Sequence, residues 1–316
     1  MKKIAIVIPS YNESEDLALI RTNDILVDLT KKFQKELNCH YDIFYVDDGS
    51  TDYTWKLINT YHLKGIKLSR NFGHQNALLA GLTTVVNDYD AIITIDADLQ
   101  DDPKAIFQMT KDFLDGYEVV FGVRSQRASD SWFKRSSAEG FYKLMGLMGV
   151  HLIYNHADFR LMSARAVRIL LAMPEHQPFL RGLAAQIGLK NKAVYYKRRE
   201  RKYGTSKYPL LKMIHFAWQG ISSFTILPLR FVGFLGGVGI VLAVIMLGYA
   251  LYGKLFGQVV SGWTSLIFSI YLVGGLILVA ISILGEYIGR IFTEVKARPR
   301  FIIEKYNMID KKGDGL

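Results

Sequence analysis

The first part of the chain alternates short apolar runs with longer amphipathic stretches. Five runs have the length and continuity of buried strands: residues 4–8, 41–46, 66–68, 91–95 and 118–123. Apolar residues recur at helical spacing after Ser14, after a predicted N-cap at Thr51 or Asp52, and after Pro103. The same spacing covers residues 75–86. This alternation predicts an α/β fold with right-handed crossovers and a mainly parallel sheet, in which ligands bind beyond the carboxyl ends of the strands.

The pattern changes near residue 228, where charged positions give way to two long apolar stretches. Residues 231–252 carry no charge, and a helix of that length, at about 1.5 Å per residue, can cross a hydrocarbon core of about 30 Å. A second uncharged stretch covers residues 255–285, and we predict a span within it at about 262–285. A buried hairpin in a water-soluble core is the alternative, but both stretches are apolar on every face.

The predicted organisation therefore has four parts. They are a globular domain at 1–207, a juxtamembrane amphipathic helix at 208–228, two transmembrane helices within 229–289, and a tail at 290–316. The segment before the first span has the spacing of a helix lying along the membrane surface, although an ordinary surface helix would show the same pattern.

Positive charge is concentrated beside the apolar stretches. The formal net charge is +10, and residues 190–212 contain nine Lys and Arg against the single acidic residue Glu200. A basic cluster beside a membrane segment favours anionic lipid headgroups, and because no recognition motif accompanies it, nucleic acid is not an expected partner.

Flanking cations also predict the orientation in the membrane. Only Lys254 lies between the two apolar stretches, whereas many cations lie outside them. The positive-inside rule then predicts a multi-pass protein of the cell (inner) membrane with both termini in the cytoplasm. Because the apolar run at 4–8 is too short for a signal peptide, the globular domain is expected on the cytoplasmic side too.

Acidic residues cluster after two of the predicted strands. Asp47 and Asp48 follow the strand at 41–46, and Asp96 and Asp98 follow the strand at 91–95. Carboxyl ends of parallel strands share one edge of the sheet, so the two clusters are expected to meet there. The alternative for Asp47 and Asp48 is a turn followed by an N-capped helix, and the alternative for Asp96 and Asp98 is a solvated loop.

The D-x-D pattern also suggests a metal. Two carboxylates two residues apart on an extended chain point to the same side and repel each other. A hard divalent cation such as Mg²⁺ or Mn²⁺ removes that repulsion and takes further oxygen ligands, here from Gln100 or from a substrate phosphate.

Five segments, in order, resemble the motifs of family 2 glycosyltransferases. They are residues 8–13 (IPSYNE), 46–52 (VDDGSTD), 96–103 (DADLQDDP), 157–163 (ADFRLMS) and 201–207 (RKYGTSK). The last two resemble the polyprenyl-phosphate glycosyltransferases, which include dolichol-phosphate mannose synthases and bactoprenol glucosyltransferases. The two apolar stretches resemble the bactoprenol branch. The resemblance covers essentially the whole chain and implies a GT-A (Rossmann-like) catalytic domain with a C-terminal two-helix transmembrane hairpin.

The resemblance also implies roles for individual residues. The nucleotide-sugar pocket would comprise Pro9, Tyr11, Glu13, Asp47, Asp48, Asp96 and Arg124. The metal would be held by Asp98, Gln100 and Asp96. The phosphates would meet Arg160, Arg201, Ser206 and Lys207. The catalytic group would consist of Asp158, Arg201 and Lys207.

The position of Asp158 matches a proposed catalytic carboxylate, but the chemistry questions a role as general base. The second pKa of a phosphate monoester is about 6, so the acceptor is already largely ionised at neutral pH. We therefore expect Asp158 to orient Arg160, the acceptor or the sugar. His74 and Asn76 follow Gly73 and either line the site or only begin a helix.

The expected reaction is inverting transfer of one sugar, first of all glucose from UDP-glucose, to undecaprenyl (polyprenyl) phosphate at the cytoplasmic membrane face. N-acetylglucosamine, galactose and GDP-mannose remain open, and the resemblance is compatible with a homo-oligomer. A processive polysaccharide synthase usually has more spans and a Q-x-x-R-W motif, which the sequence near Arg181 lacks. A non-catalytic membrane scaffold is the third alternative, and the retained acidic motifs argue against it.

Overall fold

The computed structural model describes residues 1–125, 156–175, 180–197 and 262–308, with single positions between 232 and 252. The chain divides into two compact units, Met1–Lys207 with Arg298–Leu316, and Tyr208–Ala297. The predicted helix at 208–228 and most of the first predicted span lie outside the described residues. The same holds for three predicted site residues: Arg201, Ser206 and Lys207.

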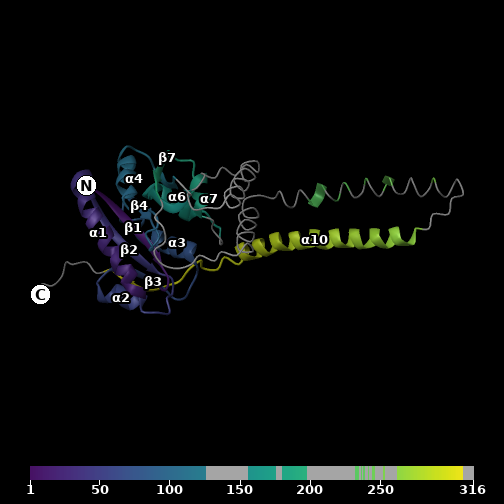
Figure 1. Ribbon diagram of the computed structural model, residues 1–316, viewed down its shortest axis with the longest axis horizontal. Helices are drawn as coiled ribbons and strands as arrows, with labels where there is room; N and C mark the ends of the chain where they lie inside the picture. Colours follow the sequence, from purple (N-terminus) through teal and green to yellow (C-terminus); the bar gives the residue numbers. More distant parts are fainter. Residues whose placement is uncertain are drawn as a thin grey trace. The chain divides into compact units, whose positions relative to one another are not determined.

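An eight-stranded sheet forms the centre of the first unit, in the order β7-β5-β6-β4-β1-β2-β3-β8 (Figure 1). The strands are β1 Lys2–Ser10, β2 Cys39–Asp47, β3 Lys64–Leu68, β4 Ala91–Thr94, β5 Val119–Arg124, β6 His156–Ser163, β7 Asn191–Tyr196 and β8 Ile303–Asn307. β1 is parallel to β2 and β4, β2 to β3, and β5 to β7, while β6 and β8 are antiparallel to their neighbours. The five predicted strands and the mainly parallel sheet are confirmed.

Helices cover both faces of this sheet. They are α1 Ala18–Leu37, which follows a 3₁₀ turn at Glu15–Leu17, α2 Thr54–Thr60, α3 His74–Val85, α4 Ala105–Leu114, α6 Ala164–Ala172 and α7 Leu180–Gln186. α1 packs against β2 and α4, whereas α3 packs against β1, β2 and α6. The first unit is therefore a three-layer α/β/α arrangement, as expected where crossover helices join parallel strands.

Alternation along the strands assigns side chains to the two faces. Successive residues of a strand point to opposite sides of the sheet. Ile4, Ile6 and Ile8 of β1 belong to the core on the α1 and α4 side. Val7 lies on the other side, against Gly81 of α3, where an added Cβ would come 2.4 Å from a Val7 methyl carbon. Glycine thus allows α3 to lie close against the sheet.

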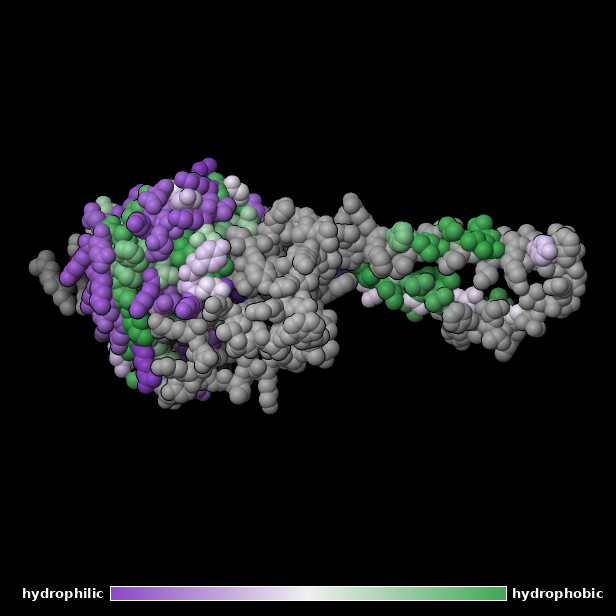
Figure 2. All heavy atoms as spheres, turned by 45° about the horizontal axis from the view of Figure 1, so that its top comes forward, coloured by the Kyte–Doolittle hydropathy of each residue, from purple (hydrophilic) through white to green (hydrophobic). Residues whose placement is uncertain are grey.

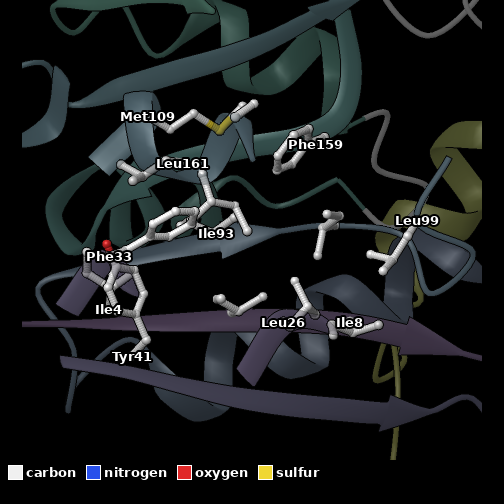
Figure 3. Close-up of a cluster of buried hydrophobic side chains, with 14 of the residues drawn as sticks. Ile4, Ile8, Leu26, Phe33, Tyr41, Ile93, Leu99, Met109, Phe159 and Leu161 are labelled. Carbon is white, nitrogen blue, oxygen red and sulfur yellow. The ribbon is translucent and has the colours of Figure 1, made fainter. Parts of the chain in front are cut away.

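The core between the sheet, α1 and α4 is continuous and apolar. Figure 3 shows these side chains converging from strands and helices, among them Ile4, Ile8, Ile93 and Leu161 of the sheet, Leu26 and Phe33 of α1, and Met109 of α4. The hydroxyl of Tyr41 donates to Thr110 Oγ1 at 3.0 Å, which satisfies a polar group in this apolar layer. A core of this kind holds the strand ends rigidly, and the site is built on those ends.

The start of α2 differs slightly from the expectation. Its N-cap is Tyr53, one residue after the predicted position. Asp52 nevertheless binds the helix, because its Oδ1 accepts from the backbone N–H of Thr54 at 2.9 Å, while its Oδ2 accepts from Ser14 N–H at 3.0 Å. The side chain therefore joins the loop after β1 to the start of α2.

The second unit contains one long helix within its described part, α10 Trp263–Val295. Its segment Leu272–Val295 has a mean hydropathy of 2.0, and none of it is buried. Among the described residues, this is the one helix long and apolar enough to cross a membrane. The predicted span at 262–285 overlaps it. Figure 2 shows hydrophobic side chains along the described surface of this unit.

The chain after α10 returns to the sheet of the first unit. β8 pairs antiparallel with β3, and Ile66 lies opposite Tyr306. Arg300 Nη2 donates to the carbonyl of Met173 at 2.6 Å, which fixes the chain just before the strand. Two parts of the predicted tail at 290–316 have regular structure, since residues 290–295 belong to α10 and residues 303–307 form an edge strand.

Candidate functional site

Strand direction brings the acidic residues to one edge of the sheet. β1 ends at Ser10 and β2 at Asp47, and these two residues are register partners. Asp96 follows β4 at the same edge. Because β6 runs in the opposite direction, Asp158 near its beginning arrives there too, and Thr94 Oγ1 donates to its carbonyl. The acidic residues after β2 and β4 thus share one edge, as the parallel-sheet rule predicts, and the antiparallel β6 adds Asp158 to it.

Asp47 is fully buried at this edge. Its Oδ1 accepts from Ser50 N–H at 2.9 Å, while its Oδ2 has no hydrogen-bond partner among the described residues. Burial raises the pKa of Asp47, and the contacts with Ser50 offset only part of that effect. A buried carboxylate oxygen without a partner is costly for the fold and suits a ligand N–H or hydroxyl.

Asp48 binds the backbone rather than facing an open site. Its two carboxylate oxygens accept from the N–H groups of Phe72 and Gly73 at 2.8 and 2.9 Å. Burial raises the pKa of Asp48, partly offset by these two donors. The side chain therefore fixes the loop from which α3 begins.

The loop after β1 is tied to the loop after β2. Asn12 N–H donates to Ser50 Oγ at 3.0 Å, and Glu13 N–H donates to Thr54 Oγ1 at 2.9 Å. Tyr11 is exposed beside them, whereas Pro9 lies buried within β1. Tyr11 thus follows directly after Ser10, the register partner of Asp47, and Glu13 lies in the same loop, tied to the start of α2.

The D-x-D segment is the accessible part of the acidic edge. The Asp96 side chain is 38% exposed and Asp98 is exposed, while Gln100 is buried beside them. Asp98 Oδ1 accepts from Gln100 N–H at 3.2 Å. His74 Nε2 lies 2.9 Å from Asp96 Oδ1, and although burial lowers the pKa of His74, the contact with Asp96 outweighs it and raises the pKa.

Asp158 is surrounded by donors. Arg181 approaches Oδ2 with Nη2 at 2.8 Å and Nε at 3.1 Å, and Arg160 Nη2 lies 3.4 Å from Oδ1. Gln75 Nε2 lies 3.5 Å from Oδ2. Burial alone would raise the pKa of Asp158, but Arg181 and Arg160 outweigh it and hold the pKa well below its usual range. The carboxylate is therefore a fixed anion.

The two arginines around Asp158 differ in their access to solvent. Arg160 has no exposed surface, and its Nη1 donates to the carbonyl of Leu180 at 2.8 Å. The Arg181 side chain is 35% exposed. A direct contact of Arg160 with a substrate phosphate does not fit its burial, whereas Arg181 reaches the surface.

Comparison with known proteins identifies the family. The model for glycosyl transferase family 2 matches residues 5–170. YkoT of Bacillus subtilis, an uncharacterized glycosyltransferase, is 46% identical over 95% of this chain and 91% of its own length. The chain belongs to glycosyl transferase family 2. It is a glycosyltransferase, and the GT-A-like α/β sheet agrees with this family.

Two further relatives have names that state a reaction. The bactoprenol glucosyl transferase of Shigella phage SfII is 36% identical over 96% of this chain and 98% of its own. A prophage bactoprenol glucosyl transferase homolog of Escherichia coli K12 is 36% identical over 96% and 99%. A solved glucosyl-3-phosphoglycerate synthase of Mycobacterium tuberculosis, in complex with Mn²⁺, UDP-glucose and phosphoglyceric acid, overlaps at a TM-score of 0.45 and 18% identity, over 69% of this chain and 77% of that chain. The family assignment rests on the sequence matches.

In this family 2 glycosyltransferase, Arg124 is already paired. Its Nε and Nη2 donate to the two carboxylate oxygens of Asp101 at 3.0 and 3.2 Å, and Asp101 is buried. The pair joins the end of β5 to the loop after β4. Whether Arg124 also reaches the donor stays a prediction, but its contacts already fix the loop that carries the D-x-D motif.

The described residues of this site offer two carboxylates and one amide as candidate ligands for a metal. Within the described residues, no group of three or more His, Cys, Asp or Glu is arranged to hold an ion. Asp98, Asp96 and Gln100 nevertheless supply accessible or nearby oxygen atoms. Mg²⁺ and Mn²⁺ are commonly bound by one or two carboxylates with water and substrate phosphates completing the shell. The donor set therefore fits a metal that binds together with a diphosphate.

Sequence reasoning missed two residues of this network, Arg181 and Gln75. Arg181 lies on α7, 23 positions after its partner Asp158, in a segment that has the pattern of an ordinary helix. Gln75 was not distinguished from the rest of its helix, although it contacts Asp158 and Leu180. For His74, the open alternative is resolved by its contact with Asp96, whereas Asn76 donates to the Phe72 carbonyl at 2.9 Å and supports the start of α3.

Proposed function

We propose that this glycosyltransferase moves one sugar, glucose from UDP-glucose, to undecaprenyl (polyprenyl) phosphate at the cytoplasmic face of the membrane. The observation that carries the proposal is the 36% identity to bactoprenol glucosyl transferases over nearly the full length of both chains. The acidic edge of the sheet also supports this proposal. It offers oxygen ligands for a metal, and beside them lies a buried network of ion pairs that suits two phosphate-bearing substrates.

The donor is proposed to bind across the ends of β1, β2 and β4. The unpartnered Oδ2 of Asp47 would accept a hydrogen bond from the base or ribose, with Tyr11 and Glu13 beside it. Asp98, Asp96 and Gln100 would hold Mg²⁺ or Mn²⁺ on the diphosphate, where a divalent cation stabilises negative charge on the leaving group. Arg201, Ser206 and Lys207 are proposed to add contacts to the phosphates.

The transfer requires little proton chemistry. An oxygen of the acceptor phosphate forms a bond to the anomeric carbon while the bond from that carbon to the diphosphate oxygen breaks. The electron pair leaves with the nucleoside diphosphate, and a single displacement inverts the anomeric centre. Because the acceptor is largely ionised near neutral pH, no general base has to remove a proton. This agrees with Asp158 as a fixed anion among arginines.

The membrane location is supported by connectivity. The segment 208–297 leaves the first unit and the chain then returns to its sheet as β8. If α10 crosses the membrane, a second crossing must precede it, since both ends of the segment belong to one domain. The apolar residues 231–252 supply that crossing. The basic residues before it would lie at anionic lipid headgroups on the cytoplasmic side.

The test is a donor panel. Membranes containing the protein are incubated with undecaprenyl phosphate and labelled UDP-glucose, UDP-N-acetylglucosamine, UDP-galactose or GDP-mannose, and the lipid product is identified by mass. We expect a monoglucosyl lipid phosphate from UDP-glucose, and none from membranes with the Asp98→Asn variant. A product with another sugar would correct the donor alone, and a polymeric product would overturn single-sugar transfer.

A further inference from the structure

Asp158, Gln75 and Arg160 together fix one arginine at the edge of the site. Asp158 binds two nitrogen atoms of Arg181, at 2.8 and 3.1 Å. This side-on contact restrains both the position and the plane of the guanidinium. Asp158 itself is only 4% exposed, so its carboxylate meets donors from the protein on several sides. Its geometric effect is to hold Arg181.

The backbone that carries Arg181 is fixed as well. Leu180, the residue before it, donates its N–H to Gln75 Oε1 at 3.2 Å and accepts from Arg160 Nη1 at 2.8 Å. Gln75 also lies 3.3 Å from His74 Nδ1, and His74 contacts Asp96. A continuous set of contacts therefore connects the D-x-D segment after β4 with the beginning of α7. Such support is what a preorganised binding group requires.

The charges of the substrates indicate what this arginine meets. A nucleotide diphosphate and a lipid phosphate are both anions, and they must approach each other within bonding distance. A metal on Asp96 and Asp98 offsets the charge of the diphosphate alone. A second cation is needed for the second phosphate, and it must reach the site surface.

Three described arginines contact Asp158 or Asp101 of the loop after β4, and their exposure separates them. Arg160 is completely enclosed, and the Arg124 side chain is 18% exposed and paired with Asp101. Arg181 is 35% exposed while its other edge is held by Asp158. Arginine is well suited to phosphate, because its planar set of N–H donors can bind two oxygen atoms at once.

We propose that Arg181 binds the phosphate of the lipid acceptor, and that Asp158 and Gln75 are positioning residues that hold it there. The proposal rests on the function proposed above. It gives Asp158 a task that needs no proton transfer, and it assigns acceptor binding to a residue that the motif comparison did not single out.

Steady-state kinetics of the full chain in detergent test this assignment. The Arg181→Gln variant should raise the KM for undecaprenyl phosphate by about tenfold or more, the loss of one charge-assisted contact, and leave the KM for the nucleotide sugar within about twofold. Arg181→Lys should recover part of the loss, because it keeps the charge but not the planar contact. Arg165→Gln, which removes an exposed arginine paired with Glu118, is the matched control and should leave both constants unchanged.

Loss of Arg181 leaves Asp158 buried with fewer partners and destabilises the fold. A second variant therefore separates a loss of binding from a loss of folding. The double variant Asp158→Asn, Arg181→Gln removes both charges and should show the same rise in acceptor KM as Arg181→Gln alone. Asp158→Asn by itself should also raise the acceptor KM and not the donor KM, as a positioning role demands. Circular dichroism confirms that each variant is folded.

The outcomes distinguish a failure of the Arg181 assignment from a failure of the proposed function. If the donor KM rises while the acceptor KM stays constant, Arg181 serves the nucleotide sugar and the assignment is wrong. If neither constant changes in the folded double variant, Arg181 has no role in binding. If the unaltered protein forms no glycolipid with any donor, the function itself fails, and this is seen without any variant.

Discussion

Burial divides the acidic side chains of the site into two groups with different tasks. Asp48 and Asp158 are buried and bind N–H groups or guanidinium groups of the protein, whereas the buried Asp47 keeps one oxygen without a partner among the described residues. Asp96 and Asp98 retain exposed surface. Only an accessible carboxylate can exchange water for a metal and a diphosphate. The same residue type therefore shapes the site in one place and meets the ligand in another.

The first prediction concerns the pH dependence of Asp158→Asn. The folded pKa of Asp158 lies below that of the unfolded chain, so its ionised form stabilises the fold above about pH 4, and this contribution is lost as the pH falls further. Because Arg181 and Arg160 hold its pKa low, it stays ionised between about pH 6 and pH 9 and is a weak base. The variant should therefore lose activity by roughly a hundredfold, equally across that range, through the broken ion pair. Recovery of its rate at high pH would indicate a general base instead.

The second prediction is a conflict between stability and binding at Asp47. Its folded pKa is raised, so the ionised side chain opposes folding above that pKa, and stability increases as the pH falls through it. Asp47→Asn should raise the free energy of unfolding by about 1 kcal/mol at pH 7.5, because it removes a buried charge with an unpartnered oxygen. The gain should disappear as the pH is lowered toward about 4.

Two measurements examine this conflict. Thermal unfolding of both proteins across the pH series gives the stability difference, and titration calorimetry with the nucleoside diphosphate gives the affinity. We expect a higher melting temperature with at least about tenfold weaker nucleotide binding, the loss of one buried charged hydrogen bond. A lower melting temperature at pH 7.5 would show that the charge of Asp47 is satisfied within the protein.

At the level of elements, the loop after β2 and the start of α3 form one assembly. Asp48 fixes the N–H groups of residues 72 and 73, and Gly49 lies against the backbone of Arg70. Gly49 has a φ of +67°, and an added Cβ would come 2.2 Å from the Arg70 carbonyl carbon. Movement of this loop would displace His74 and Gln75, which begin α3 and contact the site.

The third prediction follows from this close contact. Gly49→Ala should lower the free energy of unfolding by about 3 kcal/mol, because it combines an unfavourable backbone conformation with a steric clash against the main chain. Gly116→Ala is the control, since Gly116 also has a positive φ, of +88°, but open space around it. It should cost only about 1 kcal/mol. Equal losses in urea unfolding would mean that the contact with Arg70 contributes nothing.

Predicted and unpredicted elements differ in how they are stabilised. β1, β2 and β4 are continuous apolar runs, because both faces of these strands are covered by helices. β6 was not predicted, since its buried Asp158 and Arg160 interrupt the apolar pattern, and only their ion pair makes burial tolerable. β8 was not predicted because its charged residues Glu304 and Lys305 suit an exposed edge, and its partner strand lies far away in the sequence.

The same reasoning explains what could be predicted of the site. Asp96 and Asp98 follow directly from a strand end and a local D-x-D pattern. Arg181 does not, because its role arises from a contact with Asp158 that only the antiparallel course of β6 and the placement of α7 create. Local spacing identifies residues that act together from one loop, and it fails for residues that the fold brings together.

On the scale of the whole molecule, the return of the chain as β8 constrains the membrane topology. Residues before 208 and after 297 belong to one folded domain. A domain lies on one side of a membrane, so the segment between must cross it an even number of times or not at all. Two crossings agree with the two apolar stretches and with the cations outside them.

The fourth prediction tests this topology by cysteine labelling in intact cells. The native Cys39 is buried and should react little, so introduced cysteines can be read individually. Gln258→Cys, between the two predicted spans at 231–252 and 262–285, should react with a membrane-impermeant maleimide. Tyr306→Cys on β8, a position 58% exposed, should react only after the cells are permeabilised. Reaction of Tyr306→Cys in intact cells would contradict a cytoplasmic domain.

The most direct test of the central claim compares two acceptors that differ only in the phosphate. Purified protein in detergent receives labelled UDP-glucose and Mg²⁺ with either undecaprenyl phosphate or undecaprenol. We predict a labelled glycolipid from the phosphate alone, and none when the metal is chelated. Equal transfer to the alcohol, or labelled polysaccharide with no glycolipid, would contradict a site built to join a diphosphate-linked sugar to a lipid phosphate.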